Sequence, residues 1–190
     1  MAEDSHQMRD VGRADSALLA VLGTIAERGA IGEASLEAAV AHADQFVAAL
    51  PTECHRLADL GSGGGLPGLV IAARCPSLQI TLVERRATRA DMLARAVRAL
   101  ELSDRVEVLS GDVAVLAANE PASFDAVTAR SFAAPPITAK WAGVLLRSGG
   151  VLIVSEPPAD DPARWTVELL ERTGLTDLGR LAGVRRFRRH

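Results

Sequence analysis

The chain is poor in the features that mark membrane, secreted and metal-binding proteins. Although 48% of its 190 residues are hydrophobic, no stretch approaches the roughly 20 uninterrupted apolar residues of a membrane helix. Residues 1–10 are polar and acidic and lack the basic and apolar regions of a secretory signal, so we expect a cytoplasmic protein. Cys54 and Cys75 are not at metal-ligand spacing, and the four histidines are too scattered along the sequence to suggest a metal cluster. We therefore predict free thiols, no disulfide and no metal.

The chain also lacks an excess of positive charge. Its formal net charge is −3 and its pI is about 5.8. These values argue against a protein that holds nucleic acid by bulk charge, although a local basic patch can coexist with a negative total. The length fits one domain with a full core. We predict an N-terminal helical cap over 1–52, with helices at 16–27 and 35–50, and a ligand-binding domain over 53–190, together forming one structural unit.

A glycine-rich run is the most informative stretch that is present. It reads Asp59-Leu60-Gly61-Ser62-Gly63-Gly64-Gly65-Leu66-Pro67-Gly68, follows a strand predicted at 56–60 and precedes a helix predicted at 66–74. Glycines allow a tight turn and a close approach of backbone to a ligand. Strand, glycine loop and helix in this order are the context of a nucleotide-type cofactor site. The alternative is a turn that binds nothing.

The strand predicted at 78–84 helps to identify the cofactor. It ends in Glu84, whose carboxylate can accept hydrogen bonds from both hydroxyls of a ribose, as in NAD or S-adenosylmethionine. Leu66 stands where a dinucleotide fingerprint has its third glycine. Asp59 supplies an anion for a cofactor that presents a sulfonium and an ammonium instead of a pyrophosphate. The pattern therefore favours S-adenosylmethionine over NAD.

Strands and helices alternate beyond this point. Further strands are predicted at 105–110, 124–129, 150–155, 174–180 and 183–188, and further helices at 86–100, 136–146 and 162–172, with a short helix after the third strand. Alternation of this kind predicts an α/β, Rossmann-like fold with a mostly parallel sheet and helices on both faces.

Ligands of such folds bind beyond the carboxyl ends of the strands, where the strand order reverses. Asp112 follows the third strand, where its carboxylate can accept from an adenine amine while Val113 stacks on the ring. The alternative role for Asp112 is the N-cap of the short helix. The cofactor-binding residues predicted in this way are Asp59, Gly61, Ser62, Gly63, Leu66, Glu84, Asp112, Val113 and Ala114.

Three stretches carry a family resemblance: Leu57 to Gly68, Thr81 to Glu84 with Arg89 and Leu93 behind it, and Phe124 to Ala133. With them the chain resembles the class I S-adenosylmethionine methyltransferases, and within these the glucose-inhibited division protein B family, which methylates guanine N7 of 16S ribosomal RNA. The resemblance implies a seven-stranded sheet and a small-subunit RNA partner. It also places Arg130 against the cofactor and the incoming substrate, with a surface arginine as the alternative.

Methylation at guanine N7 asks little of a protein, because that nitrogen carries a free lone pair at neutral pH. We predict no general base and no catalytic residue beyond groups that position the reactants, Arg130 among them. The chain has no tyrosine, and therefore no Asn-Pro-Pro-Tyr motif for methylating an exocyclic amine.

Two departures from the family keep other functions open. The family usually has arginine at the position of Asp112, and it typically ends the fifth strand in Lys-Gly, where this chain has Glu156 and Pro157. The alternatives are a methyltransferase of the same fold that acts on a small molecule, and a module that binds S-adenosylmethionine without turnover. The arginines of 185–189 beside Phe187 can grip phosphates and stack a base, or can be charges on a solvated edge strand.

Overall fold

The computed structural model of the chain describes residues 2–31, 35–159 and 161–190. Its N-terminal part is helical, with α1 (Ala2–Glu27) and α2 (Leu36–Ala49). Helix α2 begins after Ser35, whose hydroxyl accepts a hydrogen bond from the Ala38 N–H at 3.1 Å, as an N-cap residue should. Helix α1 starts well before the predicted residue 16. No helix in the described part of the chain is long and apolar enough to cross a membrane.

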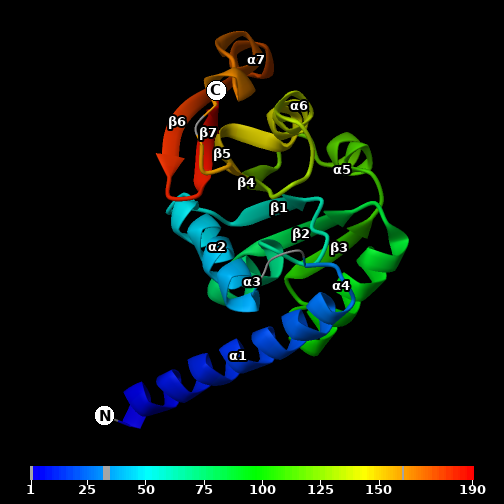
Figure 1. Cartoon of the computed structure of the whole chain (residues 1–190), viewed down its shortest axis with the longest axis vertical. Helices are drawn as coiled ribbons and strands as arrows, with labels where there is room; N and C mark the ends of the chain where they lie inside the picture. The colour runs from blue at the N-terminus through cyan, green and yellow to red at the C-terminus, as the bar shows by residue number, and fades with distance from the viewer. Residues whose placement is uncertain (1, 32–34, 160) are drawn as a thin grey trace.

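The remainder of the chain builds one seven-stranded sheet, as predicted. The strands are β1 (Arg56–Leu60), β2 (Gln79–Glu84), β3 (Val106–Ser110), β4 (Phe124–Ala129), β5 (Leu146–Ser155), β6 (Leu175–Leu181) and β7 (Val184–Arg189). They lie in the order β3-β2-β1-β4-β5-β7-β6 (Figure 1). Each neighbouring pair in the run β3-β2-β1-β4-β5 is parallel.

The prediction of a mostly parallel sheet was wrong, because the sheet is mixed. Strand β7 pairs antiparallel with both β5 and β6. The chain passes from β6 to β7 through a tight turn at Ala182 and Gly183, and so short a connection cannot make the crossover that parallel strands need.

The same topology corrects the interpretation of the C-terminal arginines. Strand β7 lies between β5 and β6 and is not an edge strand. Arg185 forms an ion pair with Asp177 of β6, with 2.5 Å between Nη2 and Oδ2. Arg189 donates to the carbonyl oxygens of Gly143 and Gly174 at 3.0 and 3.1 Å. Arg185 therefore joins the two strands of the hairpin, and Arg189 joins the hairpin to the chain at Gly143 and Gly174.

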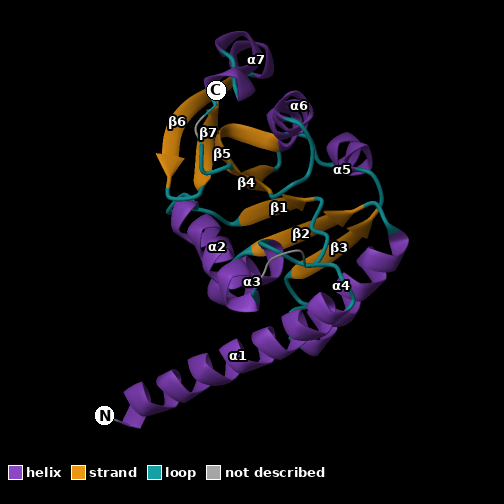
Figure 2. Ribbon diagram, in the orientation of Figure 1, coloured by secondary structure: helices purple, strands orange, loops and turns teal. Residues whose placement is uncertain are grey.

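Helices cover both faces of the sheet (Figure 2). Successive side chains of a strand point to opposite faces, so Leu57 of β1 joins one apolar layer and Ala58 joins the other. The first layer includes α1, α2, α3 (Gly68–Arg74) and α4 (Ala87–Ala99). The second includes α5 (Val113–Asn119), α6 (Pro135–Leu145) and α7 (Val167–Thr173).

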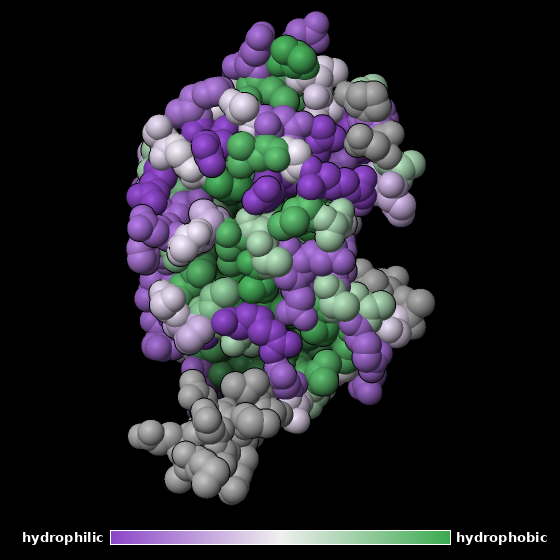
Figure 3. Space-filling view, turned by 90° about the vertical axis from the view of Figure 1, so that its left-hand side faces the viewer, coloured by the Kyte–Doolittle hydropathy of each residue, from purple (hydrophilic) through white to green (hydrophobic). Residues whose placement is uncertain are grey.

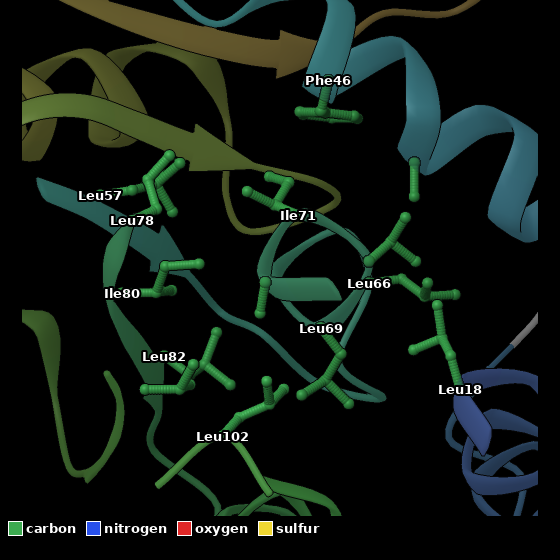
Figure 4. Packing of buried hydrophobic residues seen from close by; sticks show 14 of the residues in the cluster. Leu18, Phe46, Leu57, Leu66, Leu69, Ile71, Leu78, Ile80, Leu82 and Leu102 are labelled. Atoms are coloured by element: carbon green, nitrogen blue, oxygen red, sulfur yellow. The ribbon is translucent and has the colours of Figure 1, made fainter. Parts of the chain in front are cut away.

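The first layer ties the N-terminal helices to the sheet. Leu18 of α1 and Phe46 of α2 are almost fully buried and belong to the same cluster as Leu69 and Ile71 of α3 (Figure 4). The face on the left of Figure 1, seen directly in Figure 3, still shows a band of apolar side chains bordered by hydrophilic ones. Some apolar surface is normal for a folded chain, so the buried cluster is the more informative feature.

The helix predicted over 162–172 is interrupted. A 3-10 turn at Pro162–Arg164 precedes α7, and Trp165 between them adopts a non-helical conformation. Thr166 starts α7 by accepting a hydrogen bond from the Leu169 N–H through its hydroxyl. The break leaves the buried Trp165 indole facing Glu156 at the end of β5.

The strand order reverses between β1 and β4. From β1 the chain moves outward through β2 to β3 and then returns to the other side of β1 as β4. Leu60 lies opposite Val83 of β2 and Ala129 of β4, so the residues that follow these strands emerge at one edge of the sheet. This is the edge where open α/β sheets bind ligands.

Candidate cofactor and substrate site

The glycine loop is fixed to the end of β2 by its own backbone. The N–H groups of Gly61 and Ser62 both donate to the Val83 carbonyl, at 2.9 and 3.0 Å. Gly61 has φ +68°, and a Cβ placed on it would lie 2.9 Å from Cδ2 of Phe132. Both the left-handed conformation and the close approach of Phe132 therefore require glycine here.

Asp59 lies beneath this loop. It is 1% exposed, and its Oδ1 accepts a hydrogen bond from the Thr128 hydroxyl at 2.7 Å. Burial raises the pKa of Asp59 to about 6, while hydrogen bonds from Thr128, Ser62 and the Gly68 backbone act in the opposite direction. Its Oδ2 has no hydrogen-bond partner of good geometry among the described residues. Asp59 does not line any of the three cavities that open around the glycine loop and the end of β4.

Glu84 closes the loop from the other side. It is 6% exposed, and its two oxygens accept separate backbone N–H groups: Gly63 to Oε2 at 3.0 Å and Arg86 to Oε1 at 2.8 Å. A carboxylate has about four acceptor positions, so each oxygen can accept another donor. The carboxylate is held in one orientation and can still bind hydroxyl groups.

A cavity of about 420 Å³, cavity A, opens beside Glu84. Its wall consists of residues that follow β1 to β4 and of two side chains of α6: Gly61, Val83, Glu84, Arg85, Arg86, Arg89, Gly111, Asp112, Val113, Ser131, Phe132, Ala133, Ile137 and Trp141. The structure thus brings together Gly61, Glu84, Asp112 and Val113 of the predicted set. Polar groups among apolar and aromatic side chains are typical of a small-ligand site.

Asp112 has the capping role that was the alternative for it. Its Oδ1 accepts a hydrogen bond from the Ala114 N–H at 2.9 Å and caps α5. The side chain also lines cavity A, so capping leaves its second oxygen available to a ligand. Ala114 itself is outside the wall of cavity A and contributes to the cap through its N–H.

A second cavity, cavity B, of about 320 Å³, lies on the other side of the glycine loop. Gly61, Arg89 and Ser131 line both cavities, and the wall of cavity B also includes Ala30, Ile31, Ser62, Gly63, Gly64, Leu66 and Arg130. Burial lowers the pKa of Arg130 from its ordinary value. The remaining predicted residues, Ser62, Gly63, Leu66 and Arg130, therefore gather here.

Cavities A and B suit a cofactor with a nucleoside at one end and an amino acid at the other. The carboxylate oxygens of Glu84 can accept hydrogen bonds from hydroxyl groups in cavity A. Ile137 and Trp141 add apolar surface to the same wall as Asp112. Arg89, shared by both cavities, supplies a cation for a carboxylate. No group of three or more His, Cys, Asp or Glu side chains in the described residues could hold a metal ion.

A third cavity, cavity C, of about 260 Å³, adjoins cavity A. The two share Ser131, Phe132 and Ala133, and the rest of cavity C is formed by Ala129, Pro135, Thr138, Val154, Ser155, Glu156, Pro157, Arg164 and Trp165. Ser131 lines all three cavities and has φ +55°, a strained conformation for a residue other than glycine. Strain of this kind occurs where backbone is held for a purpose.

Sequence reasoning did not single out several of these residues. Phe132, Ser131 and Trp141 were not predicted as site residues, nor was Thr128 as the partner of Asp59. The signal for the first two was present in the stretch Ala129-Arg130-Ser131-Phe132-Ala133. Thr128 and Trp141 meet the site only through packing of segments far apart in the chain.

Comparison with known proteins identifies the family. A family model described as GidB, rRNA small subunit methyltransferase G, matches residues 40–156. Proteins named ribosomal RNA small subunit methyltransferase G from Xylella fastidiosa (strain M23) and Stenotrophomonas maltophilia (strain K279a) are both 40% identical, over 62% and 68% of this chain and 57% and 61% of their own lengths. The chain therefore spans about three-fifths of these curated relatives.

A solved structure gives independent support for the fold. Cofactor-bound Rv0187 from MTB superposes with a TM-score of 0.61 over 93% of this chain and 89% of its own, at 19% identity. An identity this low shows the α/β fold alone. Because the family model covers more than half of the sequence, the chain belongs to the rRNA small subunit methyltransferase G family.

Proposed function

We propose that the protein is an S-adenosylmethionine-dependent methyltransferase that transfers a methyl group to guanine N7 of 16S ribosomal RNA. Family membership supports the reaction class and the RNA. The observation that carries the cofactor is Glu84, a buried carboxylate on the wall of cavity A that is fixed by the N–H groups of Gly63 and Arg86. Acting on ribosomal RNA would place the protein in the cytoplasm.

The residues of cavity A would hold the nucleoside of the cofactor, and those of cavity B would hold its amino-acid portion. Glu84 would accept hydrogen bonds from the ribose hydroxyls, and the second oxygen of Asp112 would accept one from the adenine amine, with Val113 beside the ring. Arg89 would pair with the carboxylate of the amino-acid portion. Asp59 acts indirectly, by holding Thr128 beneath the loop. When bound, S-adenosylmethionine supplies an electrophilic methyl group on a sulfonium.

The chemical step needs position more than acid or base. Guanine N7 has a lone pair that requires no deprotonation, so the site has to hold this nitrogen in line with the methyl group. Orientation of this kind is worth up to roughly 7–11 kcal/mol in favourable intramolecular reactions. Phe132 and Ser131, between cavities A and C, and Arg130, in cavity B, are the groups that orient the two reactants.

The N-terminal helices act as a cap over the glycine loop in this proposal. A Cβ on Gly64 would lie 2.6 Å from the Ala30 carbonyl oxygen, so the chain after α1 packs directly on the loop. His42 of α2 is 2.9 Å from the Ser155 hydroxyl, and Ser155 lines cavity C. Residues 1–52 and 53–190 then work as one structural unit.

The charge of Glu156 does not favour a small-molecule acceptor over RNA. Glu156 is 8% exposed, and its carboxylate accepts hydrogen bonds from Arg164 Nε at 3.2 Å and from Trp165 Nε1 at 3.0 Å. The arginine compensates the anion, so phosphates that approach the rim would meet little net negative charge here.

The direct test incubates the protein with methyl-labelled S-adenosylmethionine and small ribosomal subunits that lack the N7 methyl group. We expect label at one guanine, which reduction and aniline then cleave. Binding of S-adenosylhomocysteine is measured in parallel by calorimetry. Tight binding without RNA label would remove the proposed acceptor, and absence of binding would remove the cofactor as well.

A further inference from the structure

Glu156 is the one acidic side chain on the wall of cavity C among the described residues. It comes directly after β5, and its place is fixed by two side chains that follow in sequence. Trp165 Nε1 and Arg164 Nη2 both donate to Oε1, at 3.0 and 3.4 Å, and Arg164 Nε donates to Oε2 at 3.2 Å. Oε2 therefore keeps one acceptor position for a further donor, and Oε1 gains one when a ligand displaces the long 3.4 Å contact from Arg164.

We propose that Glu156 recognises the guanine that receives the methyl group, by accepting hydrogen bonds from its N1–H and 2-amino groups. This inference rests on the proposed function. Cavity C adjoins cavity A through Ser131, Phe132 and Ala133, so a base in cavity C lies beside the cofactor. Enzymes that modify a base commonly read its Watson–Crick edge with hydrogen bonds and stack its ring on aromatic or apolar groups.

The shape of guanine makes this orientation productive. N1–H and the 2-amino group lie on the side of the purine that faces away from N7. A carboxylate that binds N1–H and the 2-amino group therefore leaves N7 pointing away from it. The Ser131 to Ala133 segment lines both cavity C and cavity A, so N7 can meet the methyl group when the base turns that edge toward this segment.

The same contact selects guanine. Adenine presents a lone pair at N1, which would face the carboxylate without a hydrogen, and inosine lacks the 2-amino group. A bidentate contact of this kind typically discriminates against the wrong base by roughly 10- to 100-fold. Removing one donor leaves a buried carboxylate oxygen without its partner, so the loss is larger than that of an exposed hydrogen bond.

The negative charge also suits the reaction. The N7 lone pair forms the new bond to the methyl carbon, the electrons of the carbon–sulfur bond go to sulfur, and no proton moves. The positive charge passes from sulfur to the guanine ring and makes N1–H a stronger donor. The contact to Glu156 therefore strengthens as the transition state is approached, which is the condition for a contribution to catalysis.

The test uses RNA that carries either guanosine or inosine at the position the wild-type protein labels. The ratio of kcat/KM for the two RNAs is compared between wild type and Glu156→Gln, and their Kd values are measured with S-adenosylhomocysteine present. We expect wild type to prefer guanosine by roughly 10- to 100-fold. Glutamine offers one acceptor oxygen in place of two, so the preference should fall to within about 3-fold, in binding as well as in turnover. Glu168→Gln, on the exposed side of α7, is the matched control and should keep the wild-type ratio.

Several outcomes overturn the inference. If wild type has the same kcat/KM on the guanosine RNA and the inosine RNA, the inference is overturned before any variant is tested. An unchanged ratio in Glu156→Gln would overturn it while the proposed function stands. Should Glu156→Gln fail to fold, judged by loss of its thermal transition, Glu156→Asp keeps the charge but withdraws it by one methylene, and its ratio must fall as well. If wild type binds S-adenosylhomocysteine yet labels no guanine, the proposed function fails and this inference fails with it.

Discussion

Gly68, the first residue of α3, is a position where a single added methyl group should be strongly destabilising. A Cβ there would lie 2.3 Å from Cδ2 of Leu82 and 2.7 Å from Oδ2 of Asp59. Carbon atoms pack best at about 3.5–4.0 Å, so the contact with Leu82 is too short by more than about 1 Å. Leu82 and Asp59 are 0% and 1% exposed, which leaves neither side chain room to move away.

We therefore expect Gly68→Ala to lower the free energy of unfolding by about 3 kcal/mol, at the upper end of what overpacking usually causes. For a chain of 190 residues this corresponds to a fall in Tm of roughly 6–12 °C. Urea unfolding followed by far-UV circular dichroism measures the first quantity. Displacement of Asp59 should also weaken S-adenosylhomocysteine binding, because the glycine loop rests on this carboxylate.

Gly23→Ala is the matched control. Gly23 lies within α1, and a Cβ there would meet no atom within 4 Å. Alanine in a helix interior is more stable than glycine by about 0.5–1 kcal/mol, so this variant should be stabilised. If Gly68→Ala is as stable as wild type while Gly23→Ala behaves as expected, the close packing of α3 on β1 and β2 is not as described.

Three further predictions concern the carboxylates of the site. Because burial holds the pKa of Asp59 at about 6, above its ordinary 3.8, this group contributes stability that is fully present below about pH 4 and is lost as the pH rises through 6. The stability difference between wild type and Asp59→Asn should change in that window by at most about 3 kcal/mol, in urea titrations at pH 4 and pH 7.5. Glu84→Gln places an amide N–H against a backbone N–H and should weaken S-adenosylhomocysteine binding roughly 10- to 100-fold by calorimetry, whereas Glu107→Gln, which lies outside cavity A, should not. Asp112→Ser should keep the helix cap and lose affinity for S-adenosylhomocysteine, and Asp112→Ala should lose affinity and about 1 kcal/mol of stability. Wild-type affinity in both variants would contradict the adenine contact.

The parts of the site that the sequence could predict are those encoded within a few residues. The glycine loop and the carboxylate at the end of β2 follow from strand, turn and helix signals, and the structure places Gly61 and Glu84 on one cavity wall. The ends of the strands were also predicted to within a few residues, because buried parallel strands appear as short apolar runs. Family membership and the seven-stranded sheet are confirmed.

The parts that were missed depend on pairing across long stretches of chain. The antiparallel insertion of β7 beside β5 brings together segments about thirty residues apart, and apolar patterning does not encode strand order. Glu156 was interpreted only as a departure from the family's Lys-Gly, and the side chains that surround it were not predicted. Its partners, Arg164 and Trp165, face it only because the predicted helix breaks between 164 and 166.

The contact between Trp165 and Phe187 makes the shape of cavity C depend on the pairing of β7. The two rings lie 4.3 Å apart, and Phe187 sits in β7 opposite Leu152 of β5. Until β7 pairs, the backbone N–H and C=O groups along one edge of β5 are unpaired and can bind strands of other chains. Trp165 then also lacks its contact with Phe187. Cavity C is therefore supported by a strand that follows all of its lining residues in the chain. A chain that ended before β7 would keep the lining residues of cavities A and C, but Trp165 would lack its contact with Phe187 and the exposed edge of β5 would favour aggregation.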